Sequence, residues 1–313
     1  RDLGGRSAGG DVRVRRRGGT FNRRPHASDP MCAHELGASD WGDWLPRAVT
    51  SADPDGLDLW YLGCNGFVLK AADGTTVVID PYCGTGDPPR TVRMVPVPFD
   101  PGTFAELVDP DAVLATHEHS DHVHGPTQRP LVAGGADYIA PDDSLAVVRE
   151  EGWTDAAGVT EAAFHEVAAG DTVELGSLTL DVEPANDPDA SHPVSYVIDA
   201  GTGTFFHGGD ARPGEAFASV GERYDIDLGA LAFGSSGMLF DEAAGEPVYK
   251  RWYSSPNEVA EAADQLRLDR LVPTHWDMWK GLTADPRSVR DHTRSFAHPE
   301  AVAVAEIGDR LSL

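Results

Sequence analysis

Short runs of apolar and β-branched residues, separated by Gly, Asn and Asp, recur along the chain from residue 57 onward. Runs of this length between turn residues predict β-strands. We place these runs at 57–62, 66–70, 76–79, 112–115, 172–174, 178–182, 194–198, 203–206, 226–233, 271–272 and 301–307. Helical patterns occupy 143–151, which ends at Gly152, and 256–267, where Ser255 is the expected N-cap with Glu258 three residues on. Two batches of strands, each followed by helices, predict an α/β fold in which two packed sheets lie between outer helices, an αββα sandwich.

The first 30 residues do not follow this pattern. They are rich in Gly and Arg, lack apolar periodicity, do not begin with Met and contain no hydrophobic region of a secretory signal. We expect residues 1–30 to be a disordered basic tail, either foreign to the protein, with Met31 as its natural start, or a basic interaction arm. We expect residues 31–313 to form a single domain, since a chain of this length can bury a full core.

The charge of the chain is strongly negative. The formal net charge is −26, Asp is far more frequent than Glu, and Lys occurs only at positions 70, 250 and 280. Abundant Asp with scarce Lys resembles the proteins of salt-loving archaea, because dense carboxylates keep a protein hydrated where salt screens their repulsion. The alternative is an acidic protein of ordinary origin. In either case a nucleic-acid partner is disfavoured, because a phosphate backbone would be repelled.

The hydrophobicity and the cysteine content of the chain bear on membrane association and on the cellular compartment. No apolar run approaches the length of a membrane span, so we expect neither a membrane anchor nor a membrane partner. Cys32, Cys64 and Cys83 are too few and too scattered for a disulfide framework. This usage fits a reducing compartment, and we expect the protein to be cytoplasmic.

The most informative segment is Ala-Thr-His-Glu-His-Ser-Asp-His-Val-His-Gly at residues 115–125, directly after the apolar run 112–115. His117, His119, Asp121 and His122 follow the spacing H-x-H-x-D-H. Alternate residues of a strand-to-helix loop can point to one side, so His117 and His119 could hold one metal ion, with Asp121 and His122 facing a neighbouring one. Imidazole suits Zn²⁺, Mn²⁺ or Fe²⁺, and the carboxylate widens the choice toward harder ions.

Two simpler interpretations of this loop are a solvated histidine-rich segment and a purely structural metal site. A structural zinc site usually closes with four ligands, often cysteines, and none lies nearby in the sequence. The pattern therefore favours a catalytic metal site.

Three later residues are candidate metal ligands, each beside an apolar run. Asp210 ends Phe-Phe-His-Gly-Gly-Asp, His275 follows Val-Pro-Thr, and His192 precedes the strand at 194–198. A carboxylate at position 210 could bridge two cations and offset their repulsion. Each residue alone is weak evidence, but together they complete the ligand set of a two-metal site.

The order of these motifs resembles that of the metallo-β-lactamase superfamily: H-x-H-x-D-H, then a His, then Gly-Asp, then a late His. Within it the chain is most similar to the L-ascorbate-6-phosphate lactonase family. The similar stretches are Trp-Gly-Asp-Trp-Leu at 41–45, Leu-Trp-Tyr-Leu-Gly-Cys-Asn-Gly at 59–66, Asp80 with Cys-Gly-Thr-Gly at 83–86, and the segments 111–117, 207–210 and 275–279. The similarity covers most of residues 40–295. The chain differs in a shorter 93–111 segment, in a shorter C-terminal end, and in His192, which that family does not keep although other members of the superfamily do.

The resemblance implies two mixed β-sheets flanked by helices and two divalent metal ions, Zn or Mn. It assigns His117, His119 and His192 to one ion, Asp121, His122 and His275 to the other, and Asp210 to both. It further implies a small-molecule substrate, a lactone or similar ester of a sugar acid, possibly phosphorylated, attacked by a metal-activated hydroxide. Asp121 and Asp210 are then the catalytic carboxylates. Assembly into a homo-oligomer is also suggested.

Further residues near these motifs are candidates for supporting roles. Asp80 either orients a ligand imidazole or caps the turn that follows it. His124, His207 and Asp277 are candidates for support or substrate contact, or for purely structural hydrogen bonds. Lys280, with Arg90 and Arg93, is a candidate contact for a substrate phosphate.

Two other functions remain open from the sequence. One is a phosphodiesterase or nuclease of the same superfamily, which the acidic composition disfavours. The other is a non-catalytic, metal-stabilised binding protein. Loss of metal would separate the second from an enzyme, because an enzyme would lose turnover.

Overall fold

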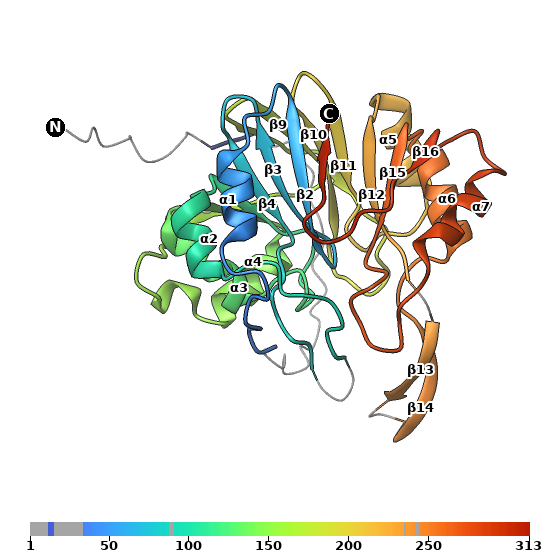
Figure 1. The fold of residues 1–313 in the computed structure, drawn as a ribbon, viewed down its shortest axis with the longest axis horizontal. Coiled ribbons are helices and arrows are strands. Elements are labelled where there is room, and N and C mark those ends of the chain that lie inside the picture. Colours follow the sequence, from blue (N-terminus) through green and yellow to red (C-terminus); the bar gives the residue numbers. More distant parts are fainter. Residues whose placement is uncertain (1–11, 16–33, 88–90, 235, 242–243) are drawn as a thin grey trace.

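The computed structural model describes residues 12–15, 34–87, 91–234, 236–241 and 244–313 (Figure 1). Two large sheets pack face to face and helices cover the outer face of each, so the predicted αββα sandwich is confirmed. The core between the sheets contains Leu59 and Phe67 of one sheet against Leu180 and Ile198 of the other.

The first sheet has seven strands and is mixed, as expected. Its order is β17 (Arg310–Ser312), β2 (Leu57–Gly63), β3 (Gly66–Ala71), β4 (Thr76–Ile79), β5 (Ala112–Leu114), β6 (Asp137–Ala140) and β7 (Phe164–Glu166). Strands β17 to β4 pair antiparallel, whereas β4 to β7 pair parallel.

The second sheet has eight strands and is also mixed. Its order is β1 (Arg13–Arg15), β8 (Thr172–Leu175), β9 (Leu178–Pro184), β10 (Val194–Asp199), β11 (Thr204–His207), β12 (Leu228–Ala232), β15 (Arg270–Thr274) and β16 (Ala301–Val302). Strands β1 to β11 pair antiparallel and β11 to β16 pair parallel.

Both faces of the central strands are buried, which explains their continuous apolar runs. In β2, Leu59 and Tyr61 face the other sheet, while Trp60 and Leu62 face the helices that cover the first sheet. Those helices are α1 (Trp44–Ser51), α2 (Pro101–Val108), α3 (Gly125–Gly134) and α4 (Asp142–Glu150). Helices α5 (Glu215–Arg223), α6 (Pro256–Gln265) and α7 (Val289–Thr293) cover the second sheet (Figure 1). Three short 3₁₀ turns lie at Trp153–Asp155, Glu161–Ala163 and Pro286–Ser288.

The predicted cap of α6 is present. The Ser255 hydroxyl accepts a hydrogen bond from the Glu258 backbone N–H, and the Glu258 carboxylate accepts one from the Ser255 N–H. This reciprocal pair satisfies two donors that the helix start would otherwise leave unpaired. The sequence did not indicate helices α1, α2, α3 and α5; α3, for example, contains Pro130 within its span.

The predicted strand at 301–307 is wrong beyond its first two residues. Strand β16 ends at Val302, because the chain then leaves the second sheet and crosses to the edge of the first, where β17 pairs with β2. A second correction concerns the N-terminal segment: Arg13–Arg15 form a strand on β8 rather than a disordered tail. The rest of that segment, 1–11 and 16–30, lies outside the described residues.

One hairpin lies outside the two large sheets. Strands β13 (Ser236–Asp241) and β14 (Glu246–Arg251) pair only with each other among the described strands, and they extend from the body at the lower right of Figure 1.

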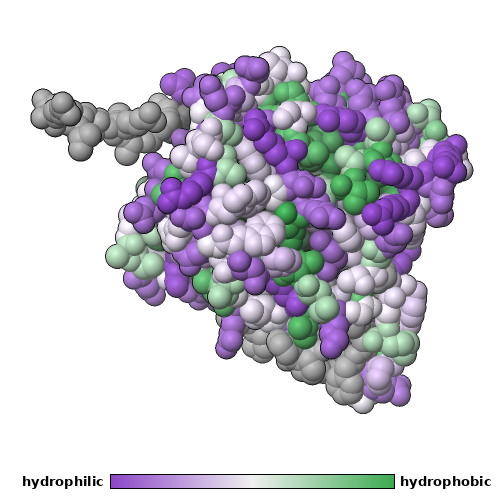
Figure 2. Space-filling model, in the orientation of Figure 1, coloured by the Kyte–Doolittle hydropathy of each residue, from purple (hydrophilic) through white to green (hydrophobic). Residues whose placement is uncertain are grey.

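Hydrophilic side chains are spread over the face shown in Figure 2, with smaller hydrophobic areas between them. Among the described residues, no helix combines the length and apolar character needed to cross a membrane.

The strand directions bring several loops to one end of the sandwich. Strands β2, β4 and β5 run the same way, and so do β11, β12 and β15, so their carboxyl ends share an edge of each sheet. The segments that follow these six strands begin at Cys64, Asp80, Ala115, Gly208, Phe233 and His275. Residues far apart in sequence therefore meet at this edge.

Candidate metal centre

The loop after β5 turns tightly and brings its imidazoles together. The His119 carbonyl accepts hydrogen bonds from the backbone N–H groups of His122 and Val123, at 2.9 and 2.8 Å. The ring centroids of His117 lie 4.5 Å from those of His119 and 3.9 Å from those of His122. The H-x-H-x-D-H spacing thus produces one compact group of imidazoles.

One set of potential metal donors consists of His117, His119, Asp187 and Asp210. The His117 Nε2 and His119 Nδ1 atoms are 2.9 Å apart. The Asp187 Oδ2 atom lies 3.6 Å from His117 Nε2 and 3.9 Å from His119 Nδ1. Three of these side chains are buried, and His119 is the more open one, with 36% of its side chain exposed.

Two further sets share His275: one is His122, Asp210 and His275, the other Cys64, Asp121 and His275. The His275 Nε2 atom is 3.3 Å from Asp121 Oδ2 and 3.6 Å from Asp210 Oδ1. The second carboxylate oxygen of Asp210 is 3.4 Å from His122 Nε2. Asp210 therefore faces both halves of the centre, the position expected for a bridging carboxylate.

Two buried atoms in this centre lack hydrogen-bond partners among the described residues, Nε2 of His122 and Oδ2 of Asp187. An unpaired buried polar atom costs about 1–3 kcal/mol. Both atoms are of the type that binds divalent transition metals, and both point into the donor sets described above. The residues present therefore fit a centre for two divalent cations.

Asp80 holds two of the imidazole-bearing residues in place. Its carboxylate accepts hydrogen bonds from the Thr116 N–H at 2.9 Å and the Thr116 hydroxyl at 2.8 Å, and Oδ2 lies 2.8 Å from His122 Nδ1. The Thr116 hydroxyl is in turn 3.0 Å from His117 Nδ1. Of the two roles considered for Asp80, the geometry matches the orientation of a ligand imidazole.

Asp210 is held in a similar way by a different pair. The Asn65 amide donates to Asp210 Oδ1 at 2.9 Å and accepts from the Thr274 hydroxyl at 2.5 Å. Gly209, with φ of +56°, allows this approach, because a Cβ there would lie 2.9 Å from the Thr116 hydroxyl. Gly209 in the Gly-Gly-Asp sequence therefore permits both the left-handed backbone of the turn and its close packing against Thr116.

Backbone strain also concentrates here. Cys64, Asp80 and His275 have φ angles of +56°, +43° and +66°, a region that non-glycine residues rarely occupy. Such conformations persist where the surrounding structure over-determines them, and they cluster at functional sites.

The charges of the centre favour cations. Burial disfavours a charged His122 imidazole, but Asp210 and Asp80 outweigh burial and raise its pKa well above the usual value. Burial, followed by the nearby Asp210 carboxylate, raises the pKa of Asp187 to about 6. Burial and then the neighbouring His122 and His119 lower the pKa of His117 well below its usual value. A bound cation would relieve the repulsion that the Asp210 carboxylate exerts on Asp187.

The structure brings together all the metal ligands expected from sequence except His192. The His192 side chain is 57% exposed, and its Nδ1 atom lies 2.5 Å from Asp143 Oδ2. Asp187, from the loop between β9 and β10, occupies the place expected for it. The available signal was that Asp187 follows the end of a strand, as the other donors do; Cys64 was likewise missed in its turn.

Other candidates have structural surroundings. The ring nitrogens of His124 lie 2.6 Å from the Thr127 hydroxyl and 2.9 Å from the His34 carbonyl, and His207 Nε2 lies 2.7 Å from the Asn65 carbonyl. Asp277 is half-buried, and burial raises the pKa of its carboxyl. Lys280 is exposed.

The cations considered for a phosphate differ in their surroundings. The Arg93 guanidinium donates to four backbone carbonyls, those of Tyr82, Gly84, Val95 and Pro96. It therefore fixes the 82–96 loop and is not free for a phosphate. Arg90 lies outside the described residues.

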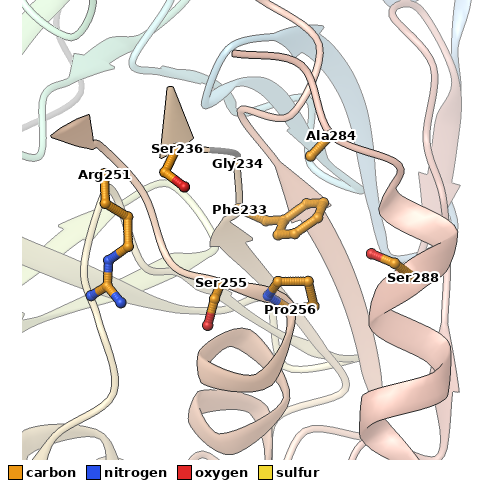
Figure 3. A pocket seen from close by; sticks show the side chains of 8 residues that line it. All are labelled: Phe233, Gly234, Ser236, Arg251, Ser255, Pro256, Ala284 and Ser288. Atoms are coloured by element: carbon orange, nitrogen blue, oxygen red, sulfur yellow. The ribbon is translucent and has the colours of Figure 1, made fainter. Parts of the chain in front are cut away.

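A cavity of about 290 Å³ lies where Phe233 follows β12 (Figure 3). The Phe233 N–H donates to the carbonyl of Thr274, the residue before His275. The polar side chains that line the cavity are Ser236 and Arg251, from the two strands of the hairpin, Ser255, which caps α6, and Ser288. The hairpin thus borders a cavity whose lining includes none of the metal donors.

Comparison with known proteins identifies a family model that matches the chain and solved structures of similar fold. The model of the β-lactamase superfamily domain matches residues 75–276. A protein named a probable L-ascorbate-6-phosphate lactonase, UlaG, from Salmonella gallinarum is 25% identical, over 80% of this chain and 78% of its own. Igni18, a metallo hydrolase from the archaeon Ignicoccus hospitalis, has a TM-score of 0.61 at 19% identity, covering 82% of this chain and 98% of its own. The metallo-β-lactamase fold protein YhfI from Bacillus subtilis has a TM-score of 0.56 at 14% identity, covering 83% and 99%.

Proposed function

The chain belongs to the β-lactamase superfamily and is a metal-dependent hydrolase of the metallo-β-lactamase fold, and on this premise we propose that it opens a lactone or similar small ester. The proposal rests on the convergence of four imidazoles and three carboxylates at one place. Two of their buried donor atoms, Nε2 of His122 and Oδ2 of Asp187, have no hydrogen-bond partner among the described residues. We choose a lactone as the substrate because the relative from Salmonella gallinarum is named a probable L-ascorbate-6-phosphate lactonase, and its similarity covers 80% of this chain.

We assign the ligands from the donor sets. His117, His119 and Asp187 would hold one cation. Asp121, His122 and His275, from the two sets that share His275, would hold the other, and Asp210 belongs to a set in each half. Such cations would supply Lewis acidity for ester hydrolysis. The donor types bear on the choice between Zn²⁺ and Mn²⁺.

The protein residues themselves orient and shield the reaction. Asp80 fixes the His122 ring through Nδ1, so Nε2 faces the centre. Asn65 holds one oxygen of Asp210, leaving the other toward His122. The Tyr253 ring stacks on His275, with centroids 4.0 Å apart, and excludes water from that side. These contacts keep the donors in place before substrate arrives, which lowers the cost of assembling the site.

Removal of metal is expected to abolish hydrolysis and to lower stability together. Purified protein would be treated with a chelator, then reloaded with Zn²⁺ or Mn²⁺, and assayed with L-ascorbate-6-phosphate, other lactones and phosphodiesters. A cation at about 100 times its Kd stabilises a protein by about 2.7 kcal/mol, so the unfolding temperature should fall by several degrees on chelation. Metal content near two per chain with lactone turnover supports the proposal.

The same assay separates the alternatives. Turnover of phosphodiesters alone would replace the substrate class and keep the hydrolase. Metal-dependent stability without turnover of any substrate class would favour a binding protein and contradict the proposed activity.

We also propose that the protein is adapted to high salt. The support is its net charge of −26 with only three Lys residues. At about 1 M salt the Debye length falls to about 3 Å, so repulsion between surface carboxylates is screened. We therefore expect the unfolding temperature to rise steadily from dilute buffer to molar KCl. A temperature that is flat or falls over this range in circular-dichroism melts would contradict the adaptation without affecting the hydrolase.

A further inference from the structure

Cys64 lies in the turn between β2 and β3 and its side chain is fully buried. Its carbonyl accepts hydrogen bonds from the His275 N–H at 2.8 Å and from the Tyr61 hydroxyl at 3.0 Å. These two bonds lock the strained turn against the start of the 275–279 segment. The position of the thiol beside the metal centre is therefore fixed by the backbone.

The sulfur atom completes a triangle of donor atoms. Cys64 Sγ is 3.2 Å from His275 Nε2 and 3.7 Å from Asp121 Oδ2, and those two atoms are 3.3 Å apart. With Zn–S near 2.3 Å and Zn–N or Zn–O near 2.0–2.2 Å, the donor atoms of a tetrahedral site are about 3.3–3.7 Å apart. Two of the observed separations, 3.3 and 3.7 Å, lie within this range, and the third, 3.2 Å from the sulfur to His275 Nε2, is just below it.

A fourth donor lies next to this triangle. His122 Nε2, buried and without a hydrogen-bond partner among the described residues, is 4.0 Å from Asp121 Oδ1 and 3.4 Å from Asp210 Oδ2. This unpaired atom is an independent indication that a ligand is missing from the donor set that shares His275 with the triangle. Cys64 itself belongs to a buried apolar cluster that also contains Met278 and Trp279.

We propose that Cys64 is a thiolate ligand of the cation held by Asp121, His122 and His275. This inference rests on the proposed metal centre and goes beyond it, because it makes the two positions chemically different. The first position has imidazole and carboxylate donors only, whereas the second adds a soft sulfur. Thiolate favours Zn²⁺ over Mn²⁺, so the second position selects Zn²⁺.

Cobalt substitution tests the assignment without relying on activity. The metal-free protein would be titrated with Co²⁺ and followed by absorption. We expect an intense near-ultraviolet thiolate-to-cobalt charge-transfer band in wild-type protein, and its loss in Cys64→Ser with the visible d–d bands retained. Cys83→Ala is the matched control, because Cys83 is the other buried thiol of the described residues and belongs to none of the donor sets. Cys32→Ser excludes a contribution from the third thiol.

Metal selectivity gives a second measurement. Cys64→Ser should weaken Zn²⁺ binding at one position on the order of 100-fold while changing Mn²⁺ binding little. Cobalt d–d bands without any charge-transfer band in wild type would overturn the thiolate assignment and leave the metal centre standing. Failure to bind Co²⁺, Zn²⁺ or Mn²⁺ at all would overturn both. Should Cys64→Ser fail to fold, the wild-type spectrum and Cys64→Ala still decide the question.

Discussion

Replacing Asp210 with Asn is expected to lower kcat/KM for the hydrolysed ester by about 10³-fold or more, with the fold retained. Asp210 is the one carboxylate that belongs to a donor set in each half of the centre, with His117, His119 and Asp187 in one and with His122 and His275 in the other. The amide keeps the size of the side chain but removes the charge that offsets repulsion between two cations. Removing that charge weakens both positions at once.

The measurement pairs kinetics with metal content and a thermal melt of the metal-free protein. Asp137→Asn is the matched control, because Asp137 also lies 2.9 Å from an imidazole, that of His165, but it is the first residue of β6 and lies outside every donor set. The control should retain metal and turnover. Near-normal turnover in Asp210→Asn would contradict the assignment of the centre.

Much of the fold could be predicted because its strands are buried on both faces. The run 76–79, which is the whole of β4, has a β-branched residue at every position and turn residues near both ends. Helices α1 and α3 were harder, since Pro46 and Pro130 lie within them and the apolar stripe is short. Their positions follow from packing against the first sheet, which a local pattern does not contain.

The metal centre was predictable where its donors are close in sequence. His117, His119, Asp121 and His122 come from one loop, so their spacing alone brings them together. Asp187 and Cys64 reach the centre through loops whose paths depend on how the two sheets pack. The sequence predicts His192 as the ligand from this loop, because it precedes the strand at 194–198 and matches the motif order of the superfamily. The chain instead places a carboxylate there and directs His192 outward to Asp143.

The second large expected effect follows from Asp187 taking the place predicted for His192. Asp187→Asn should lower metal affinity about 100-fold or more at the first position, that of His117 and His119, and should remove most of the activity. The Asp187 side chain is 6% exposed, and its Oδ2 atom, unpaired among the described residues, faces His117 and His119. His192→Asn should leave metal content and turnover nearly unchanged, because the His192 side chain lies against Asp143, a half-buried carboxylate outside every donor set.

The two variants form a direct comparison, since they lie five residues apart in the same loop and both introduce Asn. Metal content, Zn²⁺ titration and kcat/KM would be measured side by side, with melts of the metal-free forms to detect misfolding. Loss of metal in His192→Asn with retention in Asp187→Asn would restore the sequence-based ligand set. It would also mean that the 185–193 loop rearranges when the cation binds. The opposite outcome supports a first position built from two imidazoles and two carboxylates. Such a set would contrast with the sulfur-containing second position and would explain how one centre could hold two different metals.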